Sequence, residues 1–154
     1  MSVKDTKLKP VNNYGKSKVK FFKSLVKLKI TNKCKILYLR IFHVYGENEP
    51  KGRLYKNLID AVQKNKDFKM TSGDEVRDFI NIKSVTQKIY ESFKLFKKKK
   101  LFLIKHIATG KKTKVSDFAK FHWKKNKAKK KLLIGKMVKK SIYHTMYSDK
   151  KSLL

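Results

Sequence analysis

The sequence predicts an α/β fold, because segments with helical spacing of apolar residues alternate with short apolar runs of strand length. Near the start, apolar residues recur at helical spacing at Val19, Phe22, Leu25 and Val26. The run 35–42 that follows is rich in β-branched and apolar residues, as in a buried strand. Hydrophobic residues make up 40% of the 154-residue chain and aromatic residues 12%. This composition and length fit one globular domain.

The first half of the chain is expected to open with a polar lead-in over residues 1–10. A helix over 11–30 precedes the strand over 35–42. Residues 43–52 read as a loop, because two glycines and a proline punctuate them. A second helix is expected over 54–66. Its apolar residues share one face, namely Leu54, Leu58, Ile59 and Val62.

The second half continues the alternation. Short strands are expected over 68–71 and 79–82, on either side of a turn at Ser72–Asp74. Ser84 is placed to cap a helix that runs to about Phe96. Three further elements are expected: a strand over 101–108, a helix over 116–126 and a short strand over 132–134. The segment from Lys136 onward gives little periodic signal.

The charge of the chain is extreme. There are 42 basic residues against 11 acidic ones, for a net charge of +31. A nucleic-acid partner is the direct interpretation of such a charge. Only three of the basic residues are arginines, however, and arginine is the side chain that reads phosphates and bases bidentately. Lysines occur on every expected element, which indicates a compositional bias and predicts non-specific binding to nucleic acid.

A lysine-rich nucleic-acid-binding protein remains the alternative interpretation. Its candidate element is the stretch 118–131, where aromatic residues and lysines are interleaved. Such a protein would lose affinity steeply as salt is added.

Other classes of protein lack support in the sequence. The single cysteine, Cys34, allows no internal disulfide, which predicts a reducing, cytoplasmic compartment. Residues 1–20 carry no apolar signal-peptide core, and no stretch approaches the ~20 apolar residues of a membrane span. No metal site is expected, because none of the histidines has ligand spacing with Cys34. The histidines are His43, His106, His122 and His144.

Tyr14 and Lys18 are four residues apart on an expected helix and therefore share a face. A lysine cation one turn from a tyrosine favours the phenolate, which suits proton transfer at a carbon that undergoes hydride transfer. The same spacing recurs at Tyr90/Lys94 and Tyr147/Lys151, where a surface pair is the simpler interpretation. Only the pair Tyr14/Lys18 stands in the phrase Tyr-Gly-x-Ser-Lys with a strand following.

Four phrases in this order resemble the NAD-dependent nucleotide-sugar epimerase/dehydratase family, which belongs to the extended short-chain dehydrogenases/reductases. The phrases are Tyr14–Lys18, Leu39–Gly46, Thr71–Ile82 with its Arg-Asp-Phe-Ile core, and Ala108–Ala119. The resemblance covers about Pro10 to the C-terminus. It implies the last part of a Rossmann-type parallel sheet, over residues 11–50, and a mainly substrate-binding region over 51–154, together forming a single partial domain.

The resemblance also implies residue roles. Tyr14 would be the general acid/base, and Lys18 would tune it and hold the nicotinamide ribose of NAD or NADP. Arg77 would contact the diphosphate of a nucleotide-sugar substrate, for which a guanidinium fork is suited. His43 stands where the family usually has Asn, so substrate placement there would be altered. Arg53 lies where the nucleotide-binding loop of the family runs.

Outside this family context, Arg77 would be expected to pair at the surface with an acidic neighbour, namely Asp74, Glu75 or Asp78. The sequence also departs from the family, because no Gly-rich dinucleotide motif precedes Tyr14. Ser2 is too isolated to replace the upstream Ser/Thr that helps polarise the substrate carbonyl.

We therefore expect a truncated or split enzyme that binds NAD poorly and is inactive alone. Its exposed sheet edge would call for a partner, such as a separate N-terminal half. A homodimer and a non-catalytic subunit that binds nucleotide-sugar through Arg77 both stay open.

Overall fold

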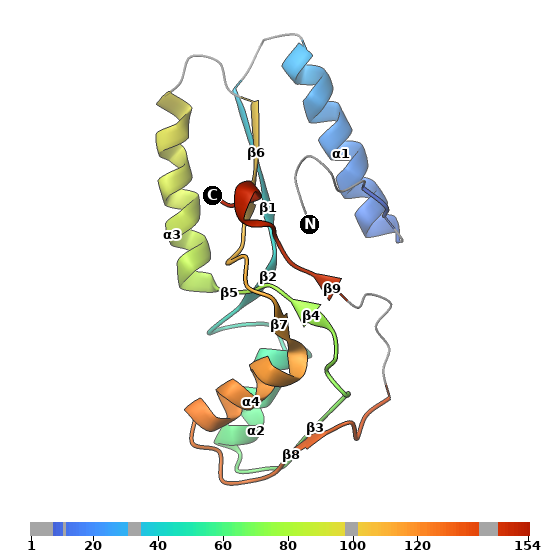
Figure 1. Cartoon of the computed structure of the whole chain (residues 1–154), viewed down its shortest axis with the longest axis vertical. Helices are drawn as coiled ribbons and strands as arrows, with labels where there is room; N and C mark the ends of the chain where they lie inside the picture. Colours follow the sequence, from blue (N-terminus) through green and yellow to red (C-terminus); the bar gives the residue numbers. More distant parts are fainter. Residues whose placement is uncertain (1–7, 11, 31–34, 98–101, 139–144) are drawn as a thin grey trace.

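A computed structural model describes residues 8–10, 12–30, 35–97, 102–138 and 145–154. The molecule is elongated, with two groups of elements stacked along its long axis (Figure 1). The upper group consists of α1 (Asn13–Ile30), β1 (Ile36–Ile41), α3 (Ile82–Ser92) and β6 (Phe102–Ile107). The lower group consists of α2 (Leu54–Gln63), β3 (Phe68–Met70), α4 (Val115–Lys125) and β8 (Leu132–Ile134). The expected α/β class is confirmed.

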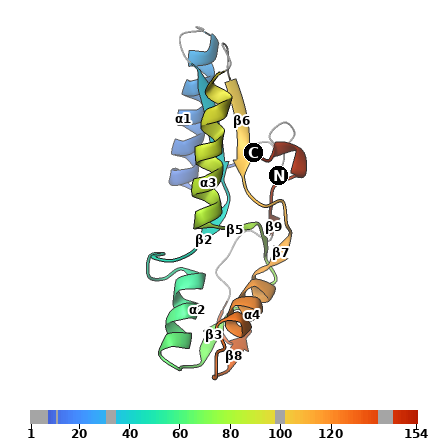
Figure 2. The same ribbon diagram turned by 90° about the vertical axis from the view of Figure 1, so that its left-hand side faces the viewer.

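The upper group is built on a parallel pair of strands. β1 and β6 pair in register from Ile36 opposite Phe102 to Ile41 opposite Ile107. α1 and α3 cover opposite faces of this pair, as the two views in Figures 1 and 2 show. On the α1 side, the rings of Phe22 and Tyr38 lie 4.9 Å apart. The apolar face of α1 therefore packs against β1, as the spacing of apolar residues in the sequence predicted.

The lower group encloses its own apolar core. β3 and β8 pair in parallel, and α2 and α4 pack beside them. The buried centre of this core consists of Leu58, Met70, Ala119 and Trp123. The indole Nε1–H of Trp123 donates to the carbonyl of Lys130 at 3.0 Å, so its polar edge is satisfied where the chain turns towards β8.

Short strands connect the two groups. β2 (His43–Tyr45) pairs in parallel with β5 (Phe79–Asn81). β4 (Val76–Arg77) lies between β7 (Thr113–Lys114) and β9 (Thr145–Met146), antiparallel to the first and parallel to the second. Ahead of β4, Gly73 has a φ of +67°, and a Cβ there would lie 2.7 Å from the backbone nitrogen of Ser116. Glycine is therefore required where this turn meets the start of α4.

Several sequence-based expectations need correction. The segment 43–52 was expected to be a loop, but its first residues form β2. α3 begins at Ile82 and is capped by Asn81, whose Oδ1 accepts from the Lys83 N–H, whereas Ser84 lies inside the helix. The two-residue strands β4, β7 and β9 were not expected, because they are too short to show a period. Two 3-10 helices complete the described elements: η1 (Phe93–Lys97) and η2 (Lys150–Ser152).

Some expectations fall outside the described residues, including Cys34 and most of the lead-in over 1–10. Within the described ranges, no helix is long and apolar enough to cross a membrane. The same ranges contain no group of three or more His, Cys, Asp or Glu side chains that could hold a metal ion.

Candidate functional site

A cavity of about 500 Å³ lies between the lower group and the connecting strands. Aliphatic, sulfur-containing and aromatic side chains form much of its wall, including Leu54, Phe68, Met70, Phe79, Val115 and Met137. Its polar wall includes His43, Asn57, Lys69, Thr71, Glu75 and Arg77. A cavity of this size with an apolar wall and a few converging polar groups is typical of a small-molecule site.

The segment after β8 closes one side of this cavity. The Gly135 N–H donates to the carbonyl of Thr71 and the Met137 N–H donates to the carbonyl of Met70, each at 3.2 Å. These bonds hold the segment against β3 and bring Met137 to the cavity wall. Sequence reasoning missed Met137, since it lies beyond the last predicted element and no periodic pattern includes it.

Arg77 reaches the cavity from the middle of a three-stranded sheet. Its strand β4 is paired on both sides, with Arg77 opposite Thr113 of β7 and Met146 of β9. The guanidinium Nη1–H donates to the carbonyl of Val76 at 3.1 Å. A half-buried arginine on a strand held from both sides has a well-defined backbone position, which favours a directed contact with an anion.

The expectation that Asp78 is a surface partner of Arg77 is wrong. Asp78 is fully buried, and its carboxylate accepts bonds from Thr109, Gly110 and Ser148 instead. Glu75 is also buried, although it was expected at the surface. Asp78 is therefore a structural anchor beside Arg77, a role that the sequence did not reveal.

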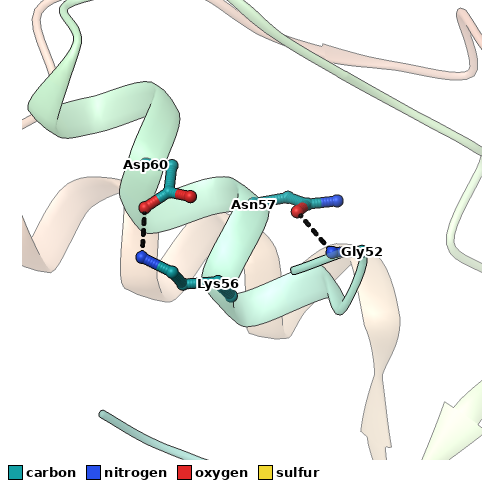
Figure 3. A network of polar contacts seen from close by, with 4 residues as sticks. All are labelled: Gly52, Lys56, Asn57 and Asp60. Atoms are coloured by element: carbon teal, nitrogen blue, oxygen red, sulfur yellow. Dashed lines mark hydrogen bonds and ion pairs between the residues drawn. The ribbon is translucent and has the colours of Figure 1, made fainter. Parts of the chain in front are cut away.

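Arg53 immediately precedes α2, next to a small polar network that includes Gly52 and Asn57, the two residues joined by a dashed line in Figure 3. The Gly52 N–H donates to Asn57 Oδ1 at 3.1 Å, and Gly52 has a φ of +89°. The Arg53 N–H donates to the carbonyl of Pro50 at 3.4 Å, and the Asn57 N–H donates to the carbonyl of Arg53 at 2.9 Å. One turn further on, the ammonium of Lys56 pairs with Asp60 at 2.6 Å. Asn57 thus fixes the loop that carries Arg53 and also lines the cavity.

His43 lines a cavity with each of the two arginines. Its backbone N–H donates to the carbonyl of Asp78 at 3.1 Å, and its ring meets the Phe79 ring edge-on at 5.2 Å. His43 shares the cavity with Arg77, and it lines a neighbouring cavity of about 420 Å³ together with Arg53. Partial burial, followed by the positive charges of Arg77 and Arg53, lowers the pKa of His43. The structure therefore places His43 in both cavities, with Arg77 in one and Arg53 in the other.

Tyr14 and Lys18 lie elsewhere, on the first turns of α1. The Gly15 N–H donates to Asn12 Oδ1 at 2.8 Å and stabilises the start of this helix. The Lys18 ammonium lies 5.2 Å from the centroid of the Tyr14 ring, and 72% of Tyr14 is exposed. The two side chains share a face, as their spacing predicted. Neither is among the residues that line the two cavities described above.

Comparison with known proteins identifies the family. A family model described as "NAD dependent epimerase/dehydratase family" matches residues 2–100, which is more than half of the chain. The chain belongs to this family. No curated protein sequence matches it.

Solved structures of two epimerases and of MoeE5 share the fold. UDP-glucose 4-epimerase from Thermotoga maritima, solved with UDP-glucose, is 20% identical with a TM-score of 0.75 over 92% of this chain and 45% of its own. UDP-N-acetylglucosamine 4-epimerase from Methanobrevibacter ruminantium is 16% identical with a TM-score of 0.79 over 95% and 47%. MoeE5 in complex with UDP-glucuronic acid and NAD is 17% identical, with a TM-score of 0.79 over 99% and 51%. The chain thus spans about half the length of these structures, and the expected Rossmann-type fold is confirmed over that half.

Proposed function

We propose that this epimerase/dehydratase chain binds the nucleotide part of a nucleotide-sugar in the cavity of about 500 Å³ beside β4. The observation that carries the proposal is that His43 and Arg77 line a largely apolar cavity, while Arg53 lies near enough for its charge to lower the pKa of His43. An arginine fork binds a diphosphate bidentately, and an apolar wall with a few polar groups suits a base. The UDP-sugars bound in the related structures support uridine diphosphate as the first ligand to test.

The chemistry that fits this family is hydride transfer at a sugar carbon, with NAD or NADP supplying the hydride acceptor. Tyr14 would accept or donate the proton of the sugar hydroxyl, and the neighbouring Lys18 ammonium would favour its phenolate form. Both side chains are exposed on α1 and therefore accessible to a ligand. We leave epimerase, dehydratase and reductase chemistry open.

Cofactor binding by these 154 residues alone is proposed to be weak. Of the groups that the family uses to hold NAD, the sequence contains Tyr14 and Lys18 but no Gly-rich turn. A dinucleotide-binding segment, in the same protein or in another chain, would complete the site, and these 154 residues alone would be inactive without it. Stoichiometric, micromolar binding of NAD to these residues alone would overturn this part of the proposal. A cytoplasmic location fits it, since the one cysteine leaves no pair for an internal disulfide.

The deciding experiment is isothermal titration calorimetry with UDP, followed by UDP-glucose. Arg77→Ala should weaken UDP binding by roughly 10-fold or more, because it removes a charge-assisted bidentate interaction with the diphosphate. Lys66→Ala is the matched control, since it removes one positive charge from an exposed residue that does not line the cavity. Equal weakening in both variants would show general charge attraction only, and unchanged binding in Arg77→Ala would place the nucleotide elsewhere.

A further inference from the structure

A third cavity, of about 430 Å³, lies against α4 and the turn before β7. It shares Phe79 with the cavity proposed for the nucleotide-sugar, but its other lining residues differ. The wall is formed mainly by rings, those of Tyr45, Phe79, Phe118, Phe121 and His122, and by Lys111, Lys112, Thr113 and Asp117. The proposed function assigns no role to this cavity.

The rings form a rigid aromatic cluster. Phe79 and Phe118 stack with centroids 3.9 Å apart, and Phe118 lies 4.4 Å from His122. Tyr45 meets Phe118 edge-on at 4.9 Å and His122 at 5.1 Å. Because Phe79, Phe118 and His122 are buried, the floor of this cavity is fixed by packing.

Phe121 lies at the rim of the cluster and, unlike the buried rings, is exposed to solvent. It is 60% exposed, and its ring meets the buried His122 ring edge-on at 5.0 Å. The ammonium of Lys125 lies 5.9 Å from the Phe121 centroid. The ring is therefore held on one side and open to solvent on the other, which is the arrangement of a stacking platform.

The surroundings of this platform are positively charged. Lys111 and Lys112 line the cavity and are exposed, and Lys120, Lys124 and Lys125 are exposed on α4. Burial, followed by the charge of Lys125, lowers the pKa of His122, so its ring stays neutral near pH 7. Asp117, exposed in the first turn of α4, is the acidic residue in the cavity wall.

We propose that this cavity is a stacking site for single-stranded nucleic acid. A base stacks on Phe121, and flanking phosphates lie against Lys111 and Lys112. Such binding needs a π-face and diffuse positive charge, and it needs no bidentate reading of base edges. Lysine can therefore serve where sequence-specific recognition would require arginine. The net charge of +31 alone predicts nucleic-acid binding over the whole surface. This cavity would instead bind the nucleic acid at one defined place.

The test is fluorescence anisotropy with a short labelled oligouridine, measured at several salt concentrations. Phe121→Ala should weaken binding by roughly 5- to 150-fold, the range found when one stacked base loses its aromatic partner. The double change Lys111→Gln/Lys112→Gln should reduce the salt slope by about 0.7 for each phosphate that a lysine no longer neutralises. Asp117→Asn should tighten binding, since it removes the carboxylate that faces the phosphates.

Matched controls separate this site from general charge. Tyr90→Ala removes an aromatic ring that is 69% exposed on α3, and Lys83→Gln/Lys94→Gln removes two exposed lysines. None of these residues lines the cavity, so binding should change little. Arg77→Ala should also retain oligouridine binding, which separates this proposal from the nucleotide-sugar site. Circular dichroism checks that each variant is folded.

Two results would overturn the proposal. One is equal weakening by the cavity variants and by the control variants, which would show non-specific attraction over the whole surface. The other is displacement of the oligomer by uridine monophosphate at the concentration of the oligomer itself, which would show a site for a free mononucleotide.

Discussion

Asp78 and Thr109 are joined by two hydrogen bonds to one carboxylate oxygen. The backbone N–H and the hydroxyl of Thr109 donate to Asp78 Oδ1 at 2.8 and 2.6 Å. The N–H of Gly110 donates to Oδ2 at 2.8 Å and that of Ser148 at 3.3 Å. This buried carboxylate therefore ties the β4–β5 segment to the turn after β6 and to the C-terminal segment, and it fixes the backbone next to Arg77.

Replacing Asp78 with Ala should destabilise the protein by about 3 kcal/mol or more. The change leaves the buried Ser148 N–H and the part-buried N–H groups of Thr109 and Gly110 without an acceptor, and bonds to a charged group contribute more than neutral ones. Urea unfolding followed by circular dichroism measures the destabilisation. Asp74→Ala is the control, since Asp74 is exposed and its removal should change the free energy of unfolding by less than about 0.5 kcal/mol. Similar values for both variants would contradict the anchoring role of Asp78.

Replacing Asn57 with Ala should weaken UDP binding several-fold while leaving the fold intact. The change removes the acceptor of the Gly52 N–H and loosens the loop that carries Arg53 (Figure 3). Both partners are exposed, so the free energy of unfolding should fall by about 1 kcal/mol or less.

Lys56→Ala is the matched control for Asn57 on the same helix. It removes only the ion pair with Asp60, worth about 0.3–0.5 kcal/mol, and should leave UDP affinity unchanged in calorimetry. If Asn57→Ala binds UDP as tightly as Lys56→Ala, the loop does not position Arg53 for the ligand.

Stability should fall as the pH is lowered below about 6.5, in part through His106. The ring of His106 is 1% exposed, and its Nδ1 lies 2.8 Å from Ser148 Oγ. The Ser148 hydroxyl donates to the carbonyl of Asp149, so Nδ1 carries the proton that it shares with Ser148. His106 Nε2 is then a buried acceptor with no hydrogen-bond partner among the described residues. Burial, followed by the charge of Arg40, lowers the pKa of His106.

The direction of the pH effect follows from that lowered pKa. The unfolded chain takes up a proton near pH 6.5, while the folded ring resists it until a lower pH. The stabilising contribution is therefore complete above pH 6.5 and is lost as the pH falls through the folded-state pKa. Urea unfolding between pH 5 and 8 tests the trend, and NMR titration of the ring protons assigns it. A His106 pKa at or above the ordinary value would contradict the prediction.

The fold was predictable where the sequence contains a repeating pattern or a long run of apolar residues. β1, β6 and the four α-helices were expected because apolar residues repeat over several turns or form a long run. The residues His43 and Arg77 were expected from family phrases, but their shared cavity depends on the pairing of β2 with β5 and of β4 with β7 and β9.

The anchor at Asp78 could not be predicted in this way. Its partners Thr109, Gly110 and Ser148 are 31, 32 and 70 residues away, and the last of them lies in a segment without periodic signal. From its neighbours in the sequence alone, Asp78 is expected to be a surface acid beside Arg77. Only the tertiary structure shows that backbone N–H groups converge on it.

Tyr14→Phe and Lys18→Ala should leave both stability and UDP affinity unchanged in the chain alone. Both side chains are exposed on α1, and neither lines the cavity that holds Arg77. We expect changes within about 0.5 kcal/mol in urea unfolding, as for other surface substitutions. Tyr90→Phe is the control, because Tyr90 has the same spacing to a lysine and is also exposed.

Once the dinucleotide-binding segment and NAD are supplied, Tyr14→Phe should lower kcat by about 10²- to 10⁴-fold, with little change in KM. The control should keep full activity, since the role of Tyr14 lies in proton transfer. A loss of UDP affinity in Tyr14→Phe would instead place its ring in the nucleotide site.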